Sequence, residues 1–206
     1  MPRFHFVRHG RTTWNVEGRV QGGGNLDSLG VAQACALAAR LAGAAFDAIY
    51  ASPYPRTRQT AYIVAGVLGL PVSLHFLLRD LDYGHLAGAR LDDFKAAYPR
   101  VWEGWRAAPD RTTFPGGESL GDLRARVLRF VERAGANGAG DVLVVTHDSP
   151  VRTAASIALG LPDARHTDPD LTTPCASLTV INVEGGRWTL ESHNDAAHLA
   201  GLDGRG

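Results

Sequence analysis

Two arginines and two histidines stand beside turn residues in three short stretches of this 206-residue chain. Arg8 and His9 precede Gly10 at the end of an apolar run, Arg56 lies in ASPYPRTRQTA, and His147 lies in VVTHDSPVR. A guanidinium group offers a fork of donors that matches the oxygens of a tetrahedral anion, and an imidazole adds a further polar group. Arg-His-Gly alone is a common tripeptide that could simply end a strand. The three stretches together indicate an anion site.

The elements around these stretches predict that the four side chains meet. Apolar runs bounded by turn residues indicate strands over 4–7, 46–51, 141–146, 176–183 and 187–191. Helical spacing predicts helices over 28–41, 55–68, 120–134 and 151–159. This alternation is typical of an α/β fold, with three αβα layers around a mostly parallel central sheet and an edge hairpin at its end. Neighbouring strand ends converge in such a sheet, so the side chains are predicted to surround one anion.

The stretch from 91 to 117 has a different character. It contains Tyr98, Trp102 and Trp105, three prolines, two short helical patterns and no convincing strand. We interpret it as part of a small helical lid insertion, at about 85–118, within a single domain of residues 1–206. Such a lid would cover the carboxyl ends of the strands, where open α/β folds place their sites.

Composition limits the classes of partner. Twenty-one basic and twenty-one acidic residues give zero formal charge, which argues against nucleic-acid or membrane binding and leaves room for a local anion pocket. No stretch reaches the roughly 18 consecutive apolar residues of a spanning helix. The amino-terminal pattern is too short for a signal segment, so a cytoplasmic protein is expected. Cys35 and Cys175 lack clustered spacing, which predicts buried free thiols and no metal site.

Six stretches in order resemble the successive motifs of one known family. They are VRHGRTTWNVEGRVQG, SPYPRTRQTA, LRDLDYG, PGGES, VVTHDSPVR and HNDAAHL, and the match runs from Phe4 to Leu199. The resemblance is to the histidine phosphatase superfamily, the family of cofactor-dependent phosphoglycerate mutase and its phosphatase relatives. Six ordered motifs are far more specific than any one of them.

The resemblance implies a role for five residues. His9 would be the nucleophile that accepts the phosphoryl group as a phosphohistidine. Arg8, Arg56 and His147 would bind the phosphoryl oxygens. Asp80 falls where the family carries the acid that protonates the leaving oxygen.

Physical chemistry agrees with these roles. A neutral imidazole is a competent nucleophile, and flanking arginines lower its pKa and favour the neutral form. Phosphoryl transfer depends on positioning and charge stabilisation, which arginines and a histidine can supply, so we expect no metal and no other cofactor. The alkoxide that leaves needs a proton, so burial would have to raise the pKa of the acid.

The identity of the acid stays open between two residues. The family usually has glutamate where this chain has Asp80, and aspartate is one methylene shorter. Asp82 would share a face with Asp80 if the segment is extended, so it is the second candidate. Either one could instead be a solvated loop carboxylate.

Five further residues are candidates for binding the substrate. The resemblance places Asn15 and the backbone of Gln21 and Gly22 along the substrate side of the pocket. Arg11 replaces the usual glutamate or glutamine, and it would either recognise a second anionic group or point into solvent. Asp148 replaces a glycine; its N–H could serve the phosphate, while its carboxylate is expected to point outward at the start of a helix.

Three functions fit these observations. The preferred one is a metal-independent phosphatase that hydrolyses a small phosphorylated metabolite. The second is a phosphoglycerate mutase, and the third is a non-catalytic phosphate-binding protein. The short chain and compact lid look more like the phosphatase branch of the family. Neither the physiological substrate nor the oligomeric state follows from the sequence, and a homodimer is an open option.

Overall fold

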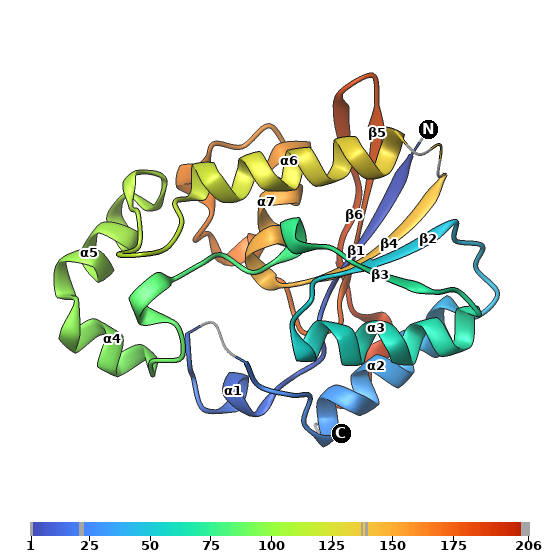
Figure 1. Cartoon of the computed structure of the whole chain (residues 1–206), viewed down its shortest axis with the longest axis horizontal. Coiled ribbons are helices and arrows are strands. Elements are labelled where there is room, and N and C mark those ends of the chain that lie inside the picture. The colour runs from blue at the N-terminus through green and yellow to red at the C-terminus, as the bar shows by residue number, and fades with distance from the viewer. Residues whose placement is uncertain (1, 21–22, 137, 139, 203–206) are drawn as a thin grey trace.

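A six-stranded sheet runs through the middle of the protein in the computed structural model, which describes residues 2–20, 23–136, 138 and 140–202 (Figure 1). Among these residues the strand order is β3-β2-β4-β1-β5-β6. The strands are β1 (Arg3–Arg8), β2 (Ala48–Ala51), β3 (Val72–Leu74), β4 (Asp141–Thr146), β5 (Leu178–Glu184) and β6 (Arg187–Asp195). Strands β1 to β4 pair in parallel, whereas β5 pairs antiparallel with both β1 and β6.

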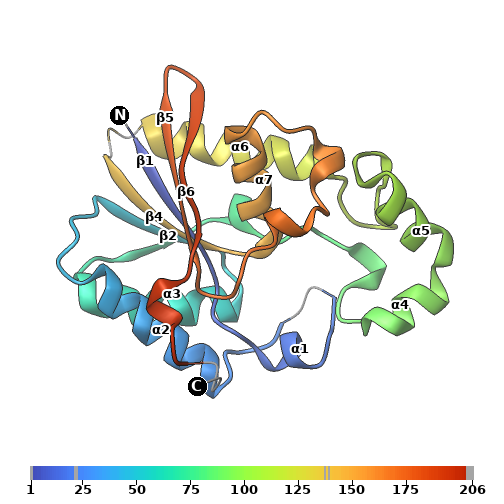
Figure 2. The same ribbon diagram turned by 180° about the vertical axis from the view of Figure 1, so that it is seen from behind.

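Helices cover both faces of this sheet. The α-helices of the described residues are α1 (Thr13–Val16), α2 (Ser28–Leu41), α3 (Pro55–Leu68), α4 (Leu91–Ala97), α5 (Pro99–Ala107), α6 (Leu120–Ala136) and α7 (Asp148–Ala158). Helices α2 and α3 lie on one face and α6 and α7 on the other, as Figures 1 and 2 show from opposite sides. Helices α4 and α5 project beyond one end of the layers (Figure 1). The three-layer α/β architecture is therefore confirmed, and the sheet is mixed with a parallel centre.

Strand β1 is central because its side chains alternate between two apolar cores. Phe4 and Phe6 pack in the core that includes residues of α6 and α7. Val7 faces the other core, which includes residues of α2 and α3. Successive side chains of a strand point to opposite faces, so this buried run fits a strand covered on both sides.

Two glycines bring the loop after β1 close to helix α2. A Cβ on Gly10 would lie 2.4 Å from the carbonyl oxygen of Gly30, and a Cβ on Gly30 would lie 1.9 Å from that of Arg11. No other residue fits this contact without a shift of the backbone. Gly10 is therefore needed for packing against α2.

The structure corrects several predicted boundaries. Strand β3 was not predicted, β2 begins at Ala48, β6 continues to Asp195, and α7 begins at Asp148. The cysteines are free, but neither is buried: Cys35 is exposed and Cys175 is half-buried. The edge hairpin and the helices over 28–41 and 55–68 are confirmed. In the part of the chain that the structure describes, no helix is both long and apolar enough to cross a membrane.

Candidate active site

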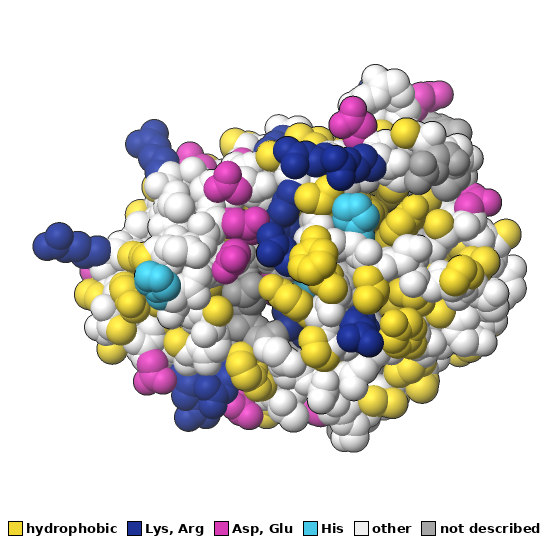
Figure 3. Space-filling view, viewed as in Figure 1, with side chains coloured by type: hydrophobic (Ala, Val, Ile, Leu, Met, Phe, Trp, Pro, Cys, Tyr) yellow, Lys and Arg dark blue, Asp and Glu magenta, His cyan; other side chains and the backbone are white. Residues whose placement is uncertain are grey.

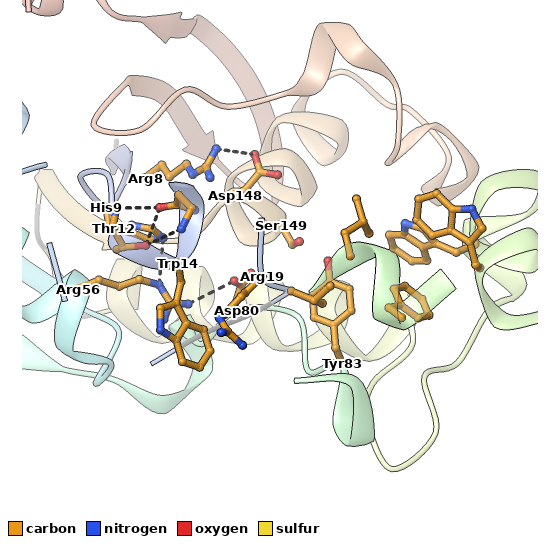
Figure 4. Close-up of a pocket in the computed structure, with 16 residues that line it drawn as sticks. Arg8, His9, Thr12, Trp14, Arg19, Arg56, Asp80, Tyr83, Asp148 and Ser149 are labelled. Atoms are coloured by element: carbon orange, nitrogen blue, oxygen red, sulfur yellow. Dashed lines mark hydrogen bonds and ion pairs between the residues drawn. The ribbon is translucent and has the colours of Figure 1, made fainter. Parts of the chain in front are cut away.

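The carboxyl ends of two neighbouring strands and the start of helix α3 deliver the four predicted residues to one place, and Figure 4 shows three of them, Arg8, His9 and Arg56. Strand β1 ends at Arg8, and the N–H of His9 donates to Thr146 at the end of β4. His147 follows as the residue that caps α7. Arg56 lies in the first turn of α3, behind Pro55. Parallel pairing of β1 with β4 therefore places the two histidines side by side, with ring centroids 5.3 Å apart.

Arg56 links the two imidazoles. Its Nε donates to Nε2 of His9 at 3.0 Å, and its Nη2 lies 2.8 Å from Nδ1 of His147. The same Nη2 lies 3.4 Å from Oδ2 of Asp80. His9 and Arg56 are each 3% exposed and His147 is fully buried. A buried guanidinium thus holds both histidines and a carboxylate in one network.

The hydrogen bonds assign a tautomer to each histidine. Nδ1 of His9 contacts the carbonyl oxygen of Gly10 at 2.7 Å, and because that oxygen can only accept, Nδ1 carries the proton. Nε2 of His9 is then a lone pair, as the contact with Arg56 requires. His147 has the other tautomer, since Nδ1 accepts from Arg56 and Nε2 donates to Ser52 Oγ at 2.8 Å.

Both histidines are held neutral. Burial, followed by the charge of Arg56, lowers the pKa of His9 and of His147 well below the usual value. Arg8 adds to both effects. A neutral, buried imidazole with its Nε2 unprotonated is the form that can act as a nucleophile.

Arg8 has a buried donor available. It donates through Nη1 to the carbonyl of Thr173, and the same atom lies 3.9 Å from Oδ1 of Asp148. Its Nε is buried and has no partner among the described residues. A buried N–H without a partner is costly, so an anion that accepts from it would be stabilised.

The structure separates the two candidate acids. Asp80 lines the cavity, and burial raises the pKa of its carboxyl group against the opposing charge of Arg56. The carboxylate of Asp82 instead accepts from the N–H of Gly84 at 2.9 Å and stabilises a turn, and Asp82 is not among the residues that line the cavity. The geometry therefore favours Asp80.

The cavity has a polar end and an aromatic end. It measures about 250 Å³. It opens between the sheet and the helices α4 and α5, where Figure 3 shows the surface hollowed. The polar end holds Arg8, His9, Arg56, Asp80 and Asp148. Val20, Leu91, Phe94, Trp102 and Trp105 add apolar surface to the lining, and Trp14 lies beside the polar residues (Figure 4). His147 is not among the residues that line the cavity, but its Nδ1 contacts two that are: Arg56 Nη2 at 2.8 Å and Asp80 Oδ2 at 3.8 Å.

The remaining predicted residues take different positions. Asn15 lines the cavity, but its Oδ1 accepts from the N–H and hydroxyl of Thr12 and caps α1. The expectation that Asp148 points outward is wrong: it lines the cavity, and its carboxylate accepts from Arg152 Nε at 2.8 Å and from the N–H of Thr173 at 3.0 Å. Gln21 and Gly22 lie outside the described residues.

Arg11 is not brought to the cavity. Its Nε pairs with Asp27 at 2.7 Å, and Asp27 caps helix α2. The charge of Arg11 is therefore used to hold the loop after β1 on α2, which neither of the two alternatives drawn from the sequence had anticipated.

The sequence did not single out several lining residues. Arg19 lies over Trp14, with its guanidinium carbon 5.4 Å from the ring centroid, and Tyr83 and Ser149 stand between the polar and aromatic ends (Figure 4). Burial raises the pKa of the Tyr83 hydroxyl, so it stays protonated. Trp14, Arg19, Tyr83 and Ser149 each lie within one of the six family-like stretches, and that position is the sequence signal that could have identified them. Within the described ranges, no cluster of three or more His, Cys, Asp or Glu is placed to hold a metal ion.

A three-layer α/β fold with paired arginines and histidines at its strand ends defines a phosphoryl-binding class of protein. The model of the histidine phosphatase superfamily (branch 1) matches residues 4–196, so the chain belongs to this superfamily. It is an enzyme, a phosphoric monoester hydrolase of the histidine phosphatase type.

Three known proteins illustrate the likeness. The chain is 31% identical to "Phosphoserine phosphatase 1" of Hydrogenobacter thermophilus, with 97% of this chain and 95% of that protein covered. It is 30% identical to "Probable phosphoglycerate mutase GpmB" of Yersinia pestis, with 97% and 95% covered. Among solved structures, Bacillus stearothermophilus YhfR superposes with a TM-score of 0.90 at 29% identity, with 97% and 100% covered.

Proposed function

We propose that the protein hydrolyses small phosphate monoesters without a metal ion, through a phosphohistidine on His9. The observation that carries this proposal is the state of His9: buried, neutral, unprotonated at Nε2 and directed at Arg56 beside the cavity. Phosphoryl transfer needs such a nucleophile together with fixed positive charge.

The first half-reaction transfers the phosphoryl group to the protein. The ester phosphate enters beside Arg8 and Arg56 and replaces the contact between Arg56 Nε and His9 Nε2. Nε2 then forms a bond to phosphorus while the bond from phosphorus to the ester oxygen breaks. Protonated Asp80 gives its proton to that oxygen, and the alcohol leaves. His147 supports this step through Arg56, from behind the cavity wall.

The second half-reaction reverses these roles. Asp80, now a carboxylate, accepts a proton from a water molecule whose oxygen attacks phosphorus. The bond from phosphorus to Nε2 of His9 breaks, inorganic phosphate forms, and His9 returns to its neutral state. The raised pKa of Asp80 suits both steps because the group must give and then regain a proton.

The aromatic end of the cavity supports a particular class of alcohol. Trp14, Trp102 and Trp105 present flat apolar surface to the cavity, and Arg19 lies over the ring of Trp14. We expect the leaving alcohol to carry apolar or aromatic surface. The name of one relative, a phosphoserine phosphatase, makes a small, charged alcohol the alternative leaving group.

The test uses p-nitrophenyl phosphate in excess EDTA. We expect turnover over roughly pH 5 to 8, because the lowered pKa of His9 favours its neutral, nucleophilic form, and loss of that turnover in His9→Ala. Turnover retained in His9→Ala would reject the nucleophile, and no hydrolysis of any phosphate ester would favour a non-catalytic phosphate-binding protein.

A phosphoglycerate mutase is the second candidate because a relative at 30% identity bears that name. A mutase must return the phosphoryl group to a second hydroxyl before water attacks. With 3-phosphoglycerate as substrate, we expect release of phosphate to exceed formation of the isomer. The opposite ratio would favour the mutase.

A further inference from the structure

The segment that carries Asp80 is held by hydrogen bonds to its carbonyl groups. Residues 79–83 belong to no helix or strand of the described chain, and they follow the short 3₁₀ helix Phe76–Leu78. The carbonyl of Leu78 accepts from the hydroxyl of Thr146 at 2.7 Å, one residue before His147. The carbonyls on either side of it need other donors.

Arg126 of helix α6 supplies those donors. Its Nη1 donates to the carbonyls of Leu77 and Arg79 at 2.8 and 2.6 Å. Its Nη2 donates to the carbonyl of Asp80 at 2.7 Å. The Arg126 side chain is 7% exposed. One buried guanidinium therefore fixes the backbone on both sides of the acid, which only a planar fork of donors can do.

Glu118 holds this guanidinium in place. Its two carboxylate oxygens accept from Nε and Nη2 of Arg126, each at 2.9 Å. The same carboxylate accepts from the N–H of Asp82 at 3.1 Å, and the N–H of Glu118 donates to the carbonyl of Asp82 at 2.8 Å. Glu118 and Arg126 thus hold the backbone of this segment by hydrogen bonds at Asp82 as well as at Asp80.

The arrangement matters because aspartate is a short side chain. Its carboxylate can reach the ester oxygen only if its backbone is well placed, and a displacement of about 1 Å can cost a hundredfold in rate. A buried ion pair is by itself weak evidence for stability, since apolar residues often replace such pairs without loss. Arg126 also donates to the carbonyls of Leu77, Arg79 and Asp80, and these bonds indicate that its role is to place this segment.

We propose that Arg126 and Glu118 are positioning residues that hold Asp80 where it protonates the leaving alcohol. The inference rests on the proposed function, in which Asp80 is the acid. Neither residue touches the substrate: both act on the backbone of the segment 77–82.

The test compares two leaving groups in Arg126→Lys. p-Nitrophenolate leaves without a proton, whereas the alkoxide of glycerol phosphate needs one, so displacement of the acid affects the second substrate more. We expect kcat/KM for glycerol phosphate to fall about tenfold to a hundredfold further than kcat/KM for p-nitrophenyl phosphate. Glu118→Gln should change the ratio in the same direction and by less, because the amide still accepts one hydrogen bond.

Arg124→Lys is the matched control. Arg124 lies on the same helix and pairs with Asp163 at 2.8 Å, away from the segment. We expect this variant to leave the ratio of the two substrates unchanged. An equal loss for both substrates in Arg126→Lys and Glu118→Gln, no loss in either variant, or failure of both variants to fold would overturn the positioning role.

A failure of this inference differs from a failure of the proposed function. Acid-stable and acid-labile phosphoprotein can be separated after the wild-type enzyme is mixed with labelled ester. If no acid-labile phosphohistidine forms, the proposed function fails. If it forms and the ratio of substrates is unchanged in the variants, only the positioning role fails.

Discussion

Arg56 organises the polar end of the cavity because its guanidinium contacts three functional groups at once. It donates to His9, contacts His147 and pairs with Asp80. Its charge helps to lower the pKa of both histidines and opposes the burial that raises the pKa of Asp80. The residue therefore keeps the nucleophile neutral while it leaves the acid protonatable, and a lysine with its single point charge could not make these contacts together.

Asp80→Asn should lower activity without lowering stability. Burial raises the pKa of Asp80 above its ordinary 3.8, so the ionised form is disfavoured in the folded state. A raised pKa contributes stability below the ordinary pKa, and this contribution is lost as pH rises through the folded value. At neutral pH the neutral amide avoids that cost, so we expect an equal or higher Tm together with a large loss of turnover on alkyl phosphates.

The comparison for this prediction is Asp82→Asn, measured by the same thermal unfolding and steady-state assays. Asp82 stabilises the turn at Gly84, so its variant should lower Tm more than it changes the ratio of alkyl to aryl phosphate turnover. The assignment of the acid is wrong if Asp82→Asn, and not Asp80→Asn, selectively loses alkyl phosphates.

At the scale of elements, helices α4 and α5 supply much of the apolar wall of the cavity. Leu91 and Phe94 come from α4, and Trp102 and Trp105 come from α5. Trp105 also packs on Phe114 and Tyr83, which ties it to the lid's own core. Trp102 contacts Phe94 at the cavity wall, with ring centroids 5.7 Å apart, so it is the better residue to remove.

Trp102→Ala should weaken binding of aromatic phosphate esters selectively. An aromatic contact contributes roughly 0.5–1.5 kcal/mol beyond its buried area, so we expect KM for a naphthyl phosphate to rise about threefold to tenfold or more. KM for glycerol phosphate should change little. Tyr98→Ala, also in the lid but not among the residues that line the cavity, is the control. Equal effects on both esters would show that the wall does not select the alcohol.

At the scale of the whole molecule, the sequence predicted the elements whose burial imposes a clear pattern. Phe4, Phe6 and Val7 give β1 a largely apolar run, interrupted by the buried His5, because both faces of the strand are covered. Strand β3 escaped prediction because it has only three residues, two of them exposed, and so carries little pattern. The pairing of Arg11 with Asp27 and the place of His147 behind Arg56 depend on how separate loops dock, which spacing along the chain does not encode.

The free energy of unfolding should fall in acid, and His166 should account for part of that fall. This buried residue packs near Trp105, and burial, assisted by the charge of Arg152, lowers its pKa from 6.5 to about 4. Below about pH 6.5 the unfolded chain binds a proton there that the folded protein does not, so stability falls as pH falls toward about 4. The difference corresponds to about 3 kcal/mol. His9 and His147 have lowered pKa values and act in the same direction.

Urea unfolding of wild type and His166→Gln, measured at intervals from about pH 7 to about pH 4, isolates this share. The variant should be less stable at neutral pH because a packed ring is lost, yet its stability should decline less steeply in acid. The comparison uses the slope with pH and not the absolute free energy, so the cost of the lost ring cancels. An unchanged slope in His166→Gln would mean that this histidine takes up its proton in the folded protein as readily as in the unfolded chain.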